Sequence, residues 1–197
     1  MSDFVNYGGW AISEPLYEDI RNLLPTGGKI LEFGSGHGTQ ILLKHYSVIS
    51  VEDNPQWVGL AARFNLTENE SRYIYAPLVK TEIVEGFEEE DVWYDSEILQ
   101  ASLEEIEWDF DLVLVDGPCS GSTHHYPHIE VEGCIGRSGL ITFVEKNKAR
   151  FQGKNFVVDD CEREHELKVA ERIGDILKGD LELKSYDEDK SHAIIRC

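Results

Sequence analysis

The stretch from Lys29 to Asn54, KILEFGSGHGTQILLKHYSVISVEDN, decides the fold. It predicts a buried strand over residues 29–33, a turn with glycine at alternate positions, a helix starting near Thr39, and a second apolar strand over residues 47–51 that leads into Glu52. Glycine lacks a Cβ and tolerates positive φ, so the backbone of such a turn can approach a ligand closely. At a helix start the turn also presents free amide N–H groups. An acid at the end of the neighbouring strand is placed to accept hydrogen bonds from a ribose diol.

The spacing of the glycines separates two kinds of cofactor. A dinucleotide fingerprint reads G-x-G-x-x-G, whereas the third glycine here comes one residue earlier and gives G-x-G-x-G, with an acid two residues before the first glycine. This arrangement resembles the first motif of class I S-adenosylmethionine-dependent methyltransferases, E/D-x-G-x-G-x-G. The matching residues are Glu32, Gly34, Gly36 and Gly38. The resemblance also includes Glu52 and the strand end Val115-Asp116-Gly117-Pro118, and it extends loosely over nearly the whole chain.

The resemblance implies S-adenosylmethionine as the cofactor and a set of residues that bind it. The turn from Gly34 to Gly38, which includes Ser35 and is followed by Thr39, would wrap the methionine moiety, and Glu32 would bind its ammonium directly or through water. Glu52 would bind the ribose hydroxyls. The other implied positions are Asp53, Asn54 and Ala76 near the adenine, Asp116 at a later strand end, and Trp10, which either covers the methionine end or caps the core.

Strand and helix patterns alternate along the rest of the chain. Beyond the first two strands, the pattern predicts strands over residues 72–76, 111–116 and 155–160, helices that start at Ser13, Asn54, Asp95 or Ser96, Gly139 and Arg163, and a final hairpin over residues 181–186 and 192–196. This order predicts an α/β fold of the Rossmann-like, doubly wound class, with a mostly parallel sheet and helices on both faces. The resemblance implies seven strands and an antiparallel C-terminal hairpin. At 197 residues, one domain over residues 1–197 is expected.

Two segments between the third strand and residue 111 are harder to interpret. Trp93 and Tyr94 precede a helix and are interpreted as part of a lid. The acidic run over residues 85–91 is interpreted as a solvated face, because a run of like charges repels itself and favours water.

Charge and composition exclude some partners. The chain has 18 basic and 38 acidic residues, a net charge of −20, and no basic patch, so nucleic acid is not expected as a substrate. No apolar run approaches the roughly 20 residues that a bilayer-spanning helix needs, and the sequence MSDFVNYGGW lacks a signal-peptide pattern. Four separated cysteines indicate reduced thiols rather than a zinc site. We therefore expect a cytoplasmic protein without a membrane partner, acting on a small polar or cationic acceptor.

The long polar loop after Asp116, CSGSTHHYPHIEVEGCIGR, is the expected substrate-recognition segment. Asp116, His124 and His125 are the candidate catalytic residues, because a carboxylate or an imidazole can take a proton from an acceptor near neutral pH. His128 belongs to the same cluster, and each of the three histidines is equally consistent with a loop residue that only makes hydrogen bonds.

Three acids, Asp116, Asp159 and Asp160, follow two strands that are expected to be neighbours. In the resembling catechol O-methyltransferase-like group, these strand ends carry a magnesium site, and hard oxygen ligands suit Mg²⁺. In the alternative, Asp159 or Asp160 caps the following helix, and a cation such as Arg137 or Arg163 compensates the charge. We favour the metal-free alternative, because Asp160 has a ready role as a helix cap and the lysine base of that group is missing here.

The sequence is consistent with two other functions. The chain would bind adenosylmethionine or a nucleoside without reacting it if it were a binding module. A dinucleotide-dependent oxidoreductase is the third possibility, although the position of the third glycine argues against it.

Overall fold

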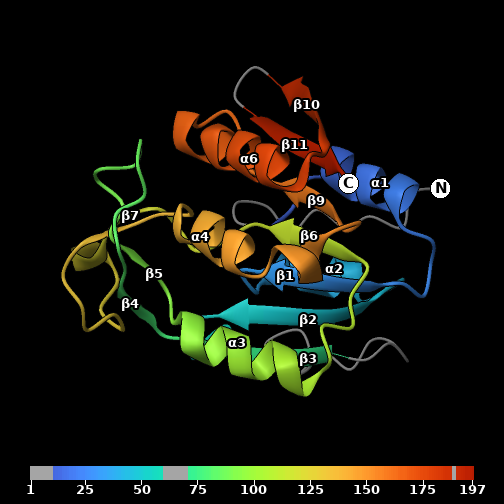
Figure 1. The fold of residues 1–197 in the computed structure, drawn as a ribbon. Coiled ribbons are helices and arrows are strands. Elements are labelled where there is room, and N and C mark those ends of the chain that lie inside the picture. Colours follow the sequence, from blue (N-terminus) through green and yellow to red (C-terminus); the bar gives the residue numbers. More distant parts are fainter. Residues whose placement is uncertain (1–10, 60–70, 188–189) are drawn as a thin grey trace.

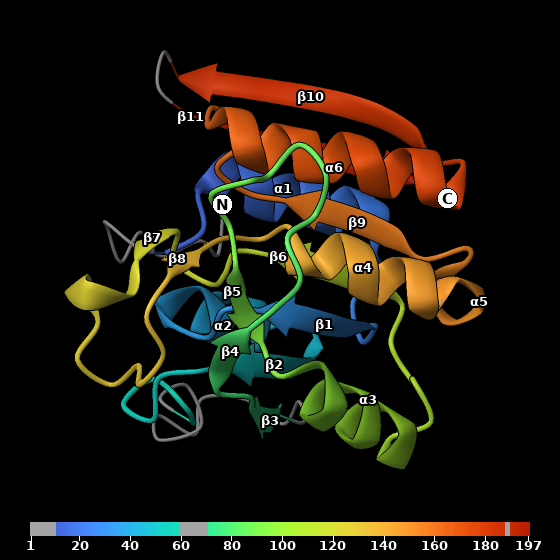
Figure 2. The ribbon, with the colours of Figure 1, turned by 60° about the vertical axis from the view of Figure 1, so that its left-hand side comes forward.

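The computed structural model describes residues 11–59, 71–187 and 190–197. Its main sheet has seven strands in the order β10-β11-β9-β6-β1-β2-β3 (Figures 1 and 2). These strands are β1 (Lys29–Phe33), β2 (Ser47–Glu52), β3 (Ser71–Tyr75), β6 (Leu112–Val115), β9 (Asn155–Val158), β10 (Asp180–Asp187) and β11 (Lys190–Arg196). β1 pairs in parallel with both β2 and β6, and β11 alone runs opposite to the other six strands of this sheet. The mostly parallel seven-stranded sheet with an antiparallel C-terminal hairpin is thus confirmed.

The chain order reverses at β1. The chain passes from β1 to β2 and β3 on one side, and later returns to place β6 and β9 on the other side. In open α/β sheets a crevice forms at such a switch point, outside the carboxyl ends of the strands.

The central strands are apolar because both faces of the sheet are covered. Alternate residues of a strand point to opposite faces. Accordingly, Val113 and Val115 of β6 belong to one apolar cluster, and Leu112 and Leu114 belong to the other.

Helices cover both faces, as the sequence predicts. α1 (Glu14–Leu23) and α2 (His37–Leu42) pack on the face that carries Leu112 and Leu114. The opposite face is covered by α3 (Ser96–Glu105), α4 (Gly139–Lys146), α5 (Lys148–Phe151) and α6 (Glu164–Leu177).

The predicted helix starts at Ser13, at Asp95 or Ser96, at Gly139 and at Arg163 agree with the structure to within one residue. Ser13 caps α1 by accepting a hydrogen bond from the Leu16 N–H, and Asp95 caps α3. α6 has no side-chain cap, so neither Asp159 nor Asp160 takes the capping role considered above. The helix predicted after Asn54 begins as a turn over residues 55–59, and its remainder lies outside the described residues.

A second, four-stranded sheet lies beyond the carboxyl ends of β1 and β2 (Figures 1 and 2). Its order is β4 (Leu78–Lys80), β5 (Val92–Tyr94), β8 (Cys134–Ile135) and β7 (Gly121–Ser122), and the 3₁₀ helix η2 (Thr123–His125) follows β7. The interpretation of Trp93 and Tyr94 as a lid is wrong, because both are buried in β5 and pack on Phe33. Through β7 and β8, the small sheet places the loop after Asp116 beside the crevice at the switch point.

The acidic run over residues 85–91 is not uniformly solvated. Glu90 is buried, and its carboxylate accepts a hydrogen bond from the Ser138 N–H and contacts the His165 ring. Glu90 therefore links this segment to Ser138 at the start of α4 and to His165 in α6. Within the described ranges, no helix combines the length and the apolar composition needed to cross a bilayer.

Candidate functional site

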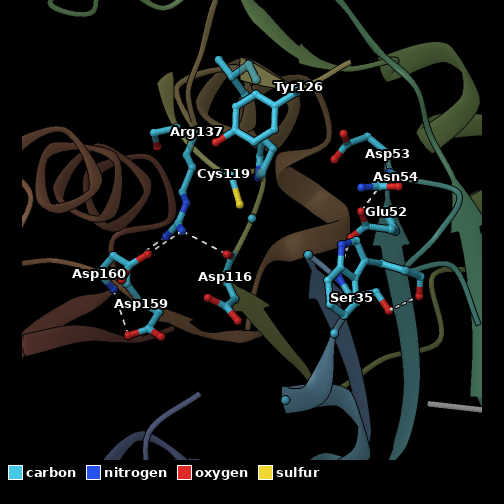
Figure 3. Close-up of a pocket in the computed structure, with 18 of the residues that line it drawn as sticks. Ser35, Glu52, Asp53, Asn54, Asp116, Cys119, Tyr126, Arg137, Asp159 and Asp160 are labelled. Atoms are coloured by element: carbon cyan, nitrogen blue, oxygen red, sulfur yellow. Dashed lines mark hydrogen bonds and ion pairs between the residues drawn. The ribbon is translucent and has the colours of Figure 1, made fainter. Parts of the chain in front are cut away.

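A cavity of about 830 Å³ opens at the carboxyl ends of β1, β2, β6 and β9 (Figure 3). We divide its wall into two parts. The β1–β2 half carries Glu32, Ser35, Glu52, Asp53 and Asn54, and the β6–β9 half carries Asp116, Asp159, Asp160 and Arg137. The cavity therefore lies where the strand order predicts a ligand-binding crevice.

The glycine turn between β1 and α2 uses its glycines in different ways. Gly34 has φ +93°, and a Cβ there would lie 2.8 Å from the Gly117 backbone nitrogen, so Gly34 lets the turns after β1 and β6 touch. A Cβ on Gly36 would meet no atom within 4 Å, although Gly36 lines the cavity. Gly34 thus serves the packing of the turn, whereas Gly36 keeps the cavity open.

Glu32 stabilises this turn through hydrogen bonds. Its Oε2 accepts hydrogen bonds from Thr39 Oγ1 at 2.7 Å and from Ser50 Oγ at 2.6 Å. Thr39 Oγ1 in turn accepts the Gly36 N–H at 3.0 Å. Burial raises the pKa of Glu32 to about 7, and the two hydroxyl donors offset part of that rise. The carboxylate lines the cavity, but its clearest role is to hold Thr39 and, through it, the turn.

Glu52 joins the end of β2 to the glycine turn. One carboxylate oxygen accepts the Ser35 N–H at 2.8 Å, and the other accepts the Asn54 N–H at 2.8 Å. Burial raises the pKa of Glu52 to about 7, and the neighbouring Asp53 charge adds to the rise. Each carboxylate oxygen keeps a lone pair for a further donor, so this acid can still bind a diol.

The loop after Asp116 reaches the β1–β2 half through His128, the third histidine of the predicted cluster, and not through His124 or His125. His128 Nε2 lies 2.8 Å from Asp53 Oδ2, and both residues line the cavity. Burial raises the pKa of Asp53, and His128 opposes that rise. His124 and His125 are exposed and do not line the cavity, so the structure does not bring these two predicted catalytic residues into the site.

Most predicted cofactor positions are brought together. The cavity wall includes Glu32, Gly34, Ser35, Gly36, Gly38, Glu52, Asp53, Asn54 and Asp116. Thr39 and Ala76 are buried behind it rather than in it. Leu78 and Trp57 line the cavity near the predicted adenine pocket, while Trp10 lies outside the described residues.

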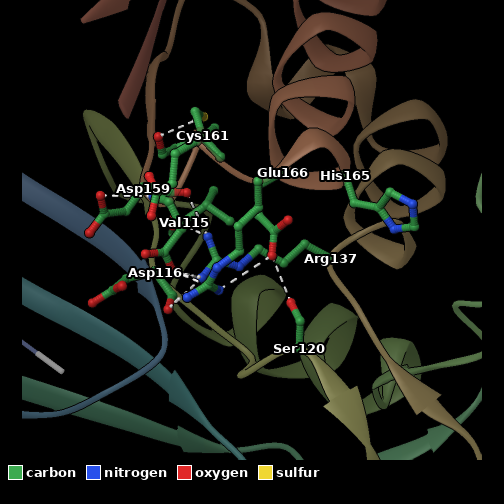
Figure 4. Close-up of polar contacts among 12 residues, drawn as sticks. Val115, Asp116, Ser120, Arg137, Asp159, Cys161, His165 and Glu166 are labelled. Carbon is green, nitrogen blue, oxygen red and sulfur yellow. Dashed lines mark hydrogen bonds and ion pairs between the residues drawn. The ribbon is translucent and has the colours of Figure 1, made fainter. Parts of the chain in front are cut away.

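Arg137 organises the β6–β9 half (Figure 4). Its guanidinium is buried and donates to the carbonyl oxygens of Asp159 at 2.8 Å and Asp116 at 3.0 Å, and to Asp160 Oδ2 at 3.0 Å. One side chain therefore ties the ends of β6 and β9 together. Because Arg137 binds these two carbonyls from one side, the carboxyl groups of Asp116 and Asp159 point away from it (Figure 3).

The pKa values of the three acids of this half are shifted in different directions. Burial raises the pKa of Asp116 well above its ordinary value, and the Asp159 carboxylate raises it further. Burial, followed by the Asp160 charge, raises the pKa of Asp159 to about 6. Burial also opposes ionisation of Asp160, but Arg137, Arg163 and Lys190 surround its carboxylate and lower its pKa overall.

Comparison with solved structures identifies the fold. A methyltransferase from Pyrococcus furiosus aligns over 98% of this chain and 87% of its own, at 14% identity and a TM-score of 0.50. Human methyltransferase-like protein 13 in complex with SAH aligns over 92% of this chain and 77% of its own, at 15% identity and a TM-score of 0.52. The human methyltransferase 10 domain containing protein aligns over 94% of this chain and 84% of its own, at 8% identity and a TM-score of 0.52.

The chain has the class I methyltransferase fold. No protein-family model and no curated protein sequence matches it. At such low identity the likeness concerns the fold, so the chemistry must come from the residues of this chain.

Within this methyltransferase fold, a magnesium site does not fit the β6–β9 half. Asp160 shares its carboxylate with Arg137 at 3.0 Å, Arg163 at 3.1 Å and Lys190 at 3.2 Å. A divalent ion bound there would have to displace cations that are already hydrogen-bonded to its ligand. Among the residues that the structure describes, no cluster of three or more His, Cys, Asp or Glu side chains is suited to a metal. The compensating cations are those considered from the sequence, Arg137 and Arg163, with Lys190 added.

Several cavity residues of this methyltransferase fold were not predicted as site residues. Tyr94, Tyr126 and Cys119 line the cavity, and so does His128, which the sequence offered only as a member of the histidine cluster. Burial raises the pKa of Cys119 to about 11, so its thiol stays protonated and contributes packing rather than a nucleophile. The histidine-rich character of the loop was a signal for His128, but the contact with Asp53 depends on how the small sheet folds the loop back.

Proposed function

We propose that this protein is an S-adenosylmethionine-dependent methyltransferase that transfers a methyl group to oxygen or nitrogen of a small polar or cationic molecule in the cytoplasm. The observation that carries the proposal is the joint held by Glu52. Its carboxylate accepts the Ser35 N–H of the G-x-G-x-G turn at 2.8 Å, so the turn and the acid form one continuous wall. An adenosine ribose at this wall would meet the acid, and the attached methionine would follow the open backbone at Gly36.

The strand order supports one direction for the bound cofactor. With the adenosine at the end of β2, the chain of the methionine runs over β1 toward β6, because β1 lies between these strands. The reactive methyl group would therefore face the β6–β9 half, where Asp116 lines the same cavity. Human methyltransferase-like protein 13 in complex with SAH provides a fold precedent for an adenosyl ligand.

The cavity supports a small acceptor. Its volume of about 830 Å³ lies in the range of sites that take small molecules and cofactors. The net charge of −20 disfavours the approach of a nucleic-acid backbone and favours cationic or neutral molecules. Nucleic acid and membrane lipid are accordingly not expected as acceptors.

The residues present can supply what methyl transfer requires. Displacement at a sulfonium methyl needs the nucleophile in line with the carbon–sulfur bond, and it needs loss of a proton when the nucleophile is a hydroxyl or an ammonium. Asp116 is the first candidate to take that proton, since it lines the cavity and burial raises the pKa of its carboxyl group well above its ordinary value, which makes its carboxylate a stronger base. The role of His124 and His125 as bases stays a prediction that the exposed position of both side chains does not favour.

Isothermal titration calorimetry with S-adenosylmethionine, S-adenosylhomocysteine (SAH) and NAD tests the cofactor. We expect both adenosyl compounds to bind and NAD to bind much more weakly. Tight binding of NAD alone would instead favour an oxidoreductase.

A screen of small molecules with methyl-labelled S-adenosylmethionine tests turnover. Labelled product with a small acceptor supports the proposal. Binding of the cofactor without transfer to any acceptor would favour a binding module, and efficient labelling of RNA or DNA would contradict the expected acceptor class.

A further inference from the structure

The cations of the β6–β9 half contact carboxylates other than Asp116 and Asp159. Arg137 binds the carboxylate of Asp160, Arg163 contacts Asp160 and Glu166, and Lys190 contacts Asp160 and Glu162. Arg137 touches Asp116 and Asp159 only at their backbone carbonyl oxygens. The three cations of this part of the cavity wall therefore form their ion pairs with Asp160, Glu162 and Glu166.

Asp116 and Asp159 face the cavity, and within the described residues no cation forms an ion pair with either carboxyl group, although the charge of Arg137 lowers the pKa of both. Their carboxyl groups point away from Arg137 (Figure 3). Asp159 Oδ1 accepts the N–H of Asp160 at 2.9 Å. Within the described part of the chain, no side chain or backbone donor reaches the Asp116 carboxylate. Two carboxyl groups held close together in a buried wall favour a cation between them.

A second feature of the wall also lacks a partner. The Tyr94 hydroxyl is fully buried, lines the cavity, and has no hydrogen-bond partner among the described residues. A Cβ on Gly117, the residue after Asp116, would lie 3.1 Å from this hydroxyl. A buried hydroxyl without a partner costs free energy, so its place beside the Asp116 turn indicates a polar ligand atom at this point.

We propose that the methyl acceptor is an amine, bound as its ammonium by the carboxylates of Asp116 and Asp159 with the Tyr94 hydroxyl beside them, and that the protein is an N-methyltransferase. This inference rests on the proposed function and selects nitrogen over oxygen. The strongly negative chain also favours the arrival of a cationic acceptor over a neutral one.

The transfer balances with the groups present. The carboxylate pair takes one proton from the bound ammonium and so frees the nitrogen lone pair. This lone pair attacks the methyl carbon, a carbon–nitrogen bond forms, and the carbon–sulfur bond breaks with its electrons going to sulfur. The products are neutral SAH, a methylated ammonium and one protonated carboxyl group, which returns its proton to water.

Binding of two cofactor analogues tests the cation site without a known acceptor. Sinefungin carries an amine where S-adenosylmethionine carries its sulfonium methyl group, whereas SAH is uncharged there. Both compounds keep the amino-acid ammonium, so the ratio of their affinities reports only charge at the reacting centre. We expect sinefungin to bind at least about tenfold tighter than SAH to the wild type, and Asp116→Asn and Asp159→Asn each to reduce that ratio severalfold.

Glu162→Gln is the matched control for this measurement. It removes one negative charge from the same end of the sheet, but Glu162 does not line the cavity. The ratio should stay at the wild-type value in this variant, and thermal melts of all three variants would show that they fold. If Asp116→Asn weakens sinefungin and SAH equally, the carboxylate binds the amino-acid ammonium of the cofactor, and the proposal is wrong.

A paired acceptor screen tests the choice of nitrogen. Methyl-labelled S-adenosylmethionine is incubated with primary amines and with alcohols on the same carbon skeletons. Labelling of amines, lost in Asp159→Asn while SAH affinity is kept, supports the proposal. Labelling of the alcohols alone would overturn it but leave the methyltransferase assignment intact, whereas failure to bind either cofactor analogue would refute that assignment itself.

Discussion

The β1–β2 half of the cavity and its β6–β9 half are assembled from different kinds of contact. In the first half, Glu52 binds backbone N–H groups of residues near it in sequence or in the adjoining turn. In the second half, Arg137 comes from the end of a long loop and binds carbonyl oxygens of two strands. The first half is therefore built by a local motif, and the second by long-range contacts; under the proposed function the first would bind the cofactor and the second the acceptor. The difference predicts that changes in the first half affect every adenosyl ligand alike, whereas changes in the second discriminate among ligands.

The largest effect is expected at the glycine turn, where two similar substitutions should fail differently. Gly36→Val places a side chain in the open cavity, so it should abolish SAH binding while leaving the melting temperature near that of the wild type. Gly34→Val forces a branched residue into φ +93° against the Gly117 backbone, and it should destabilise the fold by roughly 2 to 4 kcal/mol. Calorimetric titration and thermal denaturation of the two variants separate these outcomes. Equal loss of stability in both would mean that Gly36 also serves packing.

Glu32 should make stability depend on pH. Its folded pKa of about 7 lies above the ordinary 4.5, so its stabilising contribution is complete below pH 4.5 and is lost as the pH rises through 7. A shift of this size corresponds to about 3 kcal/mol at most. Glu32→Gln removes the titration and keeps hydrogen-bonding capacity. Urea denaturation from pH 5 to pH 8 should give a flatter stability profile for the variant than for the wild type, and parallel profiles would contradict a buried titrating Glu32.

Glu52 should control adenosine binding in a pH-dependent way. Ribose hydroxyls donate to the ionised carboxylate, and the free protein holds the pKa of Glu52 at about 7, so SAH should bind more weakly as the pH falls below 7. Glu52→Gln should weaken binding by roughly 1.5 to 3 kcal/mol above pH 7 and should remove this pH dependence. Titrations of SAH at pH 6 and pH 8 provide the measurement. A variant that binds like the wild type at pH 8 would place the ribose elsewhere.

His128 should give the smallest effect, because it acts on the adenosine end only through Asp53. His128→Ala removes the 2.8 Å contact with Asp53 and should weaken SAH binding by about two- to fivefold, the range expected for a partly exposed ion pair. His124→Ala is the matched control for SAH affinity, since His124 is exposed and outside the cavity wall. A larger loss in His124→Ala than in His128→Ala would show that the loop lies differently over the ligand.

The sequence was sufficient for the elements whose signals are local. The β1–β2 half follows from adjacent strand, turn and helix patterns, so Glu32, the glycines and Glu52 could be assigned to the cavity. The order of the long elements also predicted the main sheet.

The remainder depends on contacts that leave no local pattern. The strands of the small sheet have two or three residues each, too few to show an alternation of polar and apolar positions. The Asp53–His128 contact spans 75 residues, and the cluster around Asp160 joins residues from the loop, α6 and β11. The histidines of the loop were therefore visible as a group, but which of them reaches the cavity was not.

Arg137 limits where the loop after Asp116 can be exchanged between proteins of this fold. Residues 119–136 line or flank the cavity, and under the proposed function they are the residues to replace in order to change the acceptor. Arg137, the next residue in the chain, donates hydrogen bonds from its guanidinium to carbonyl oxygens at the ends of both β6 and β9. A graft that ends before Arg137 keeps these hydrogen bonds, whereas a graft that replaces it removes them from the backbone beside Asp116 and Asp159. The usable boundary for recombining this loop is therefore the peptide bond that precedes Arg137.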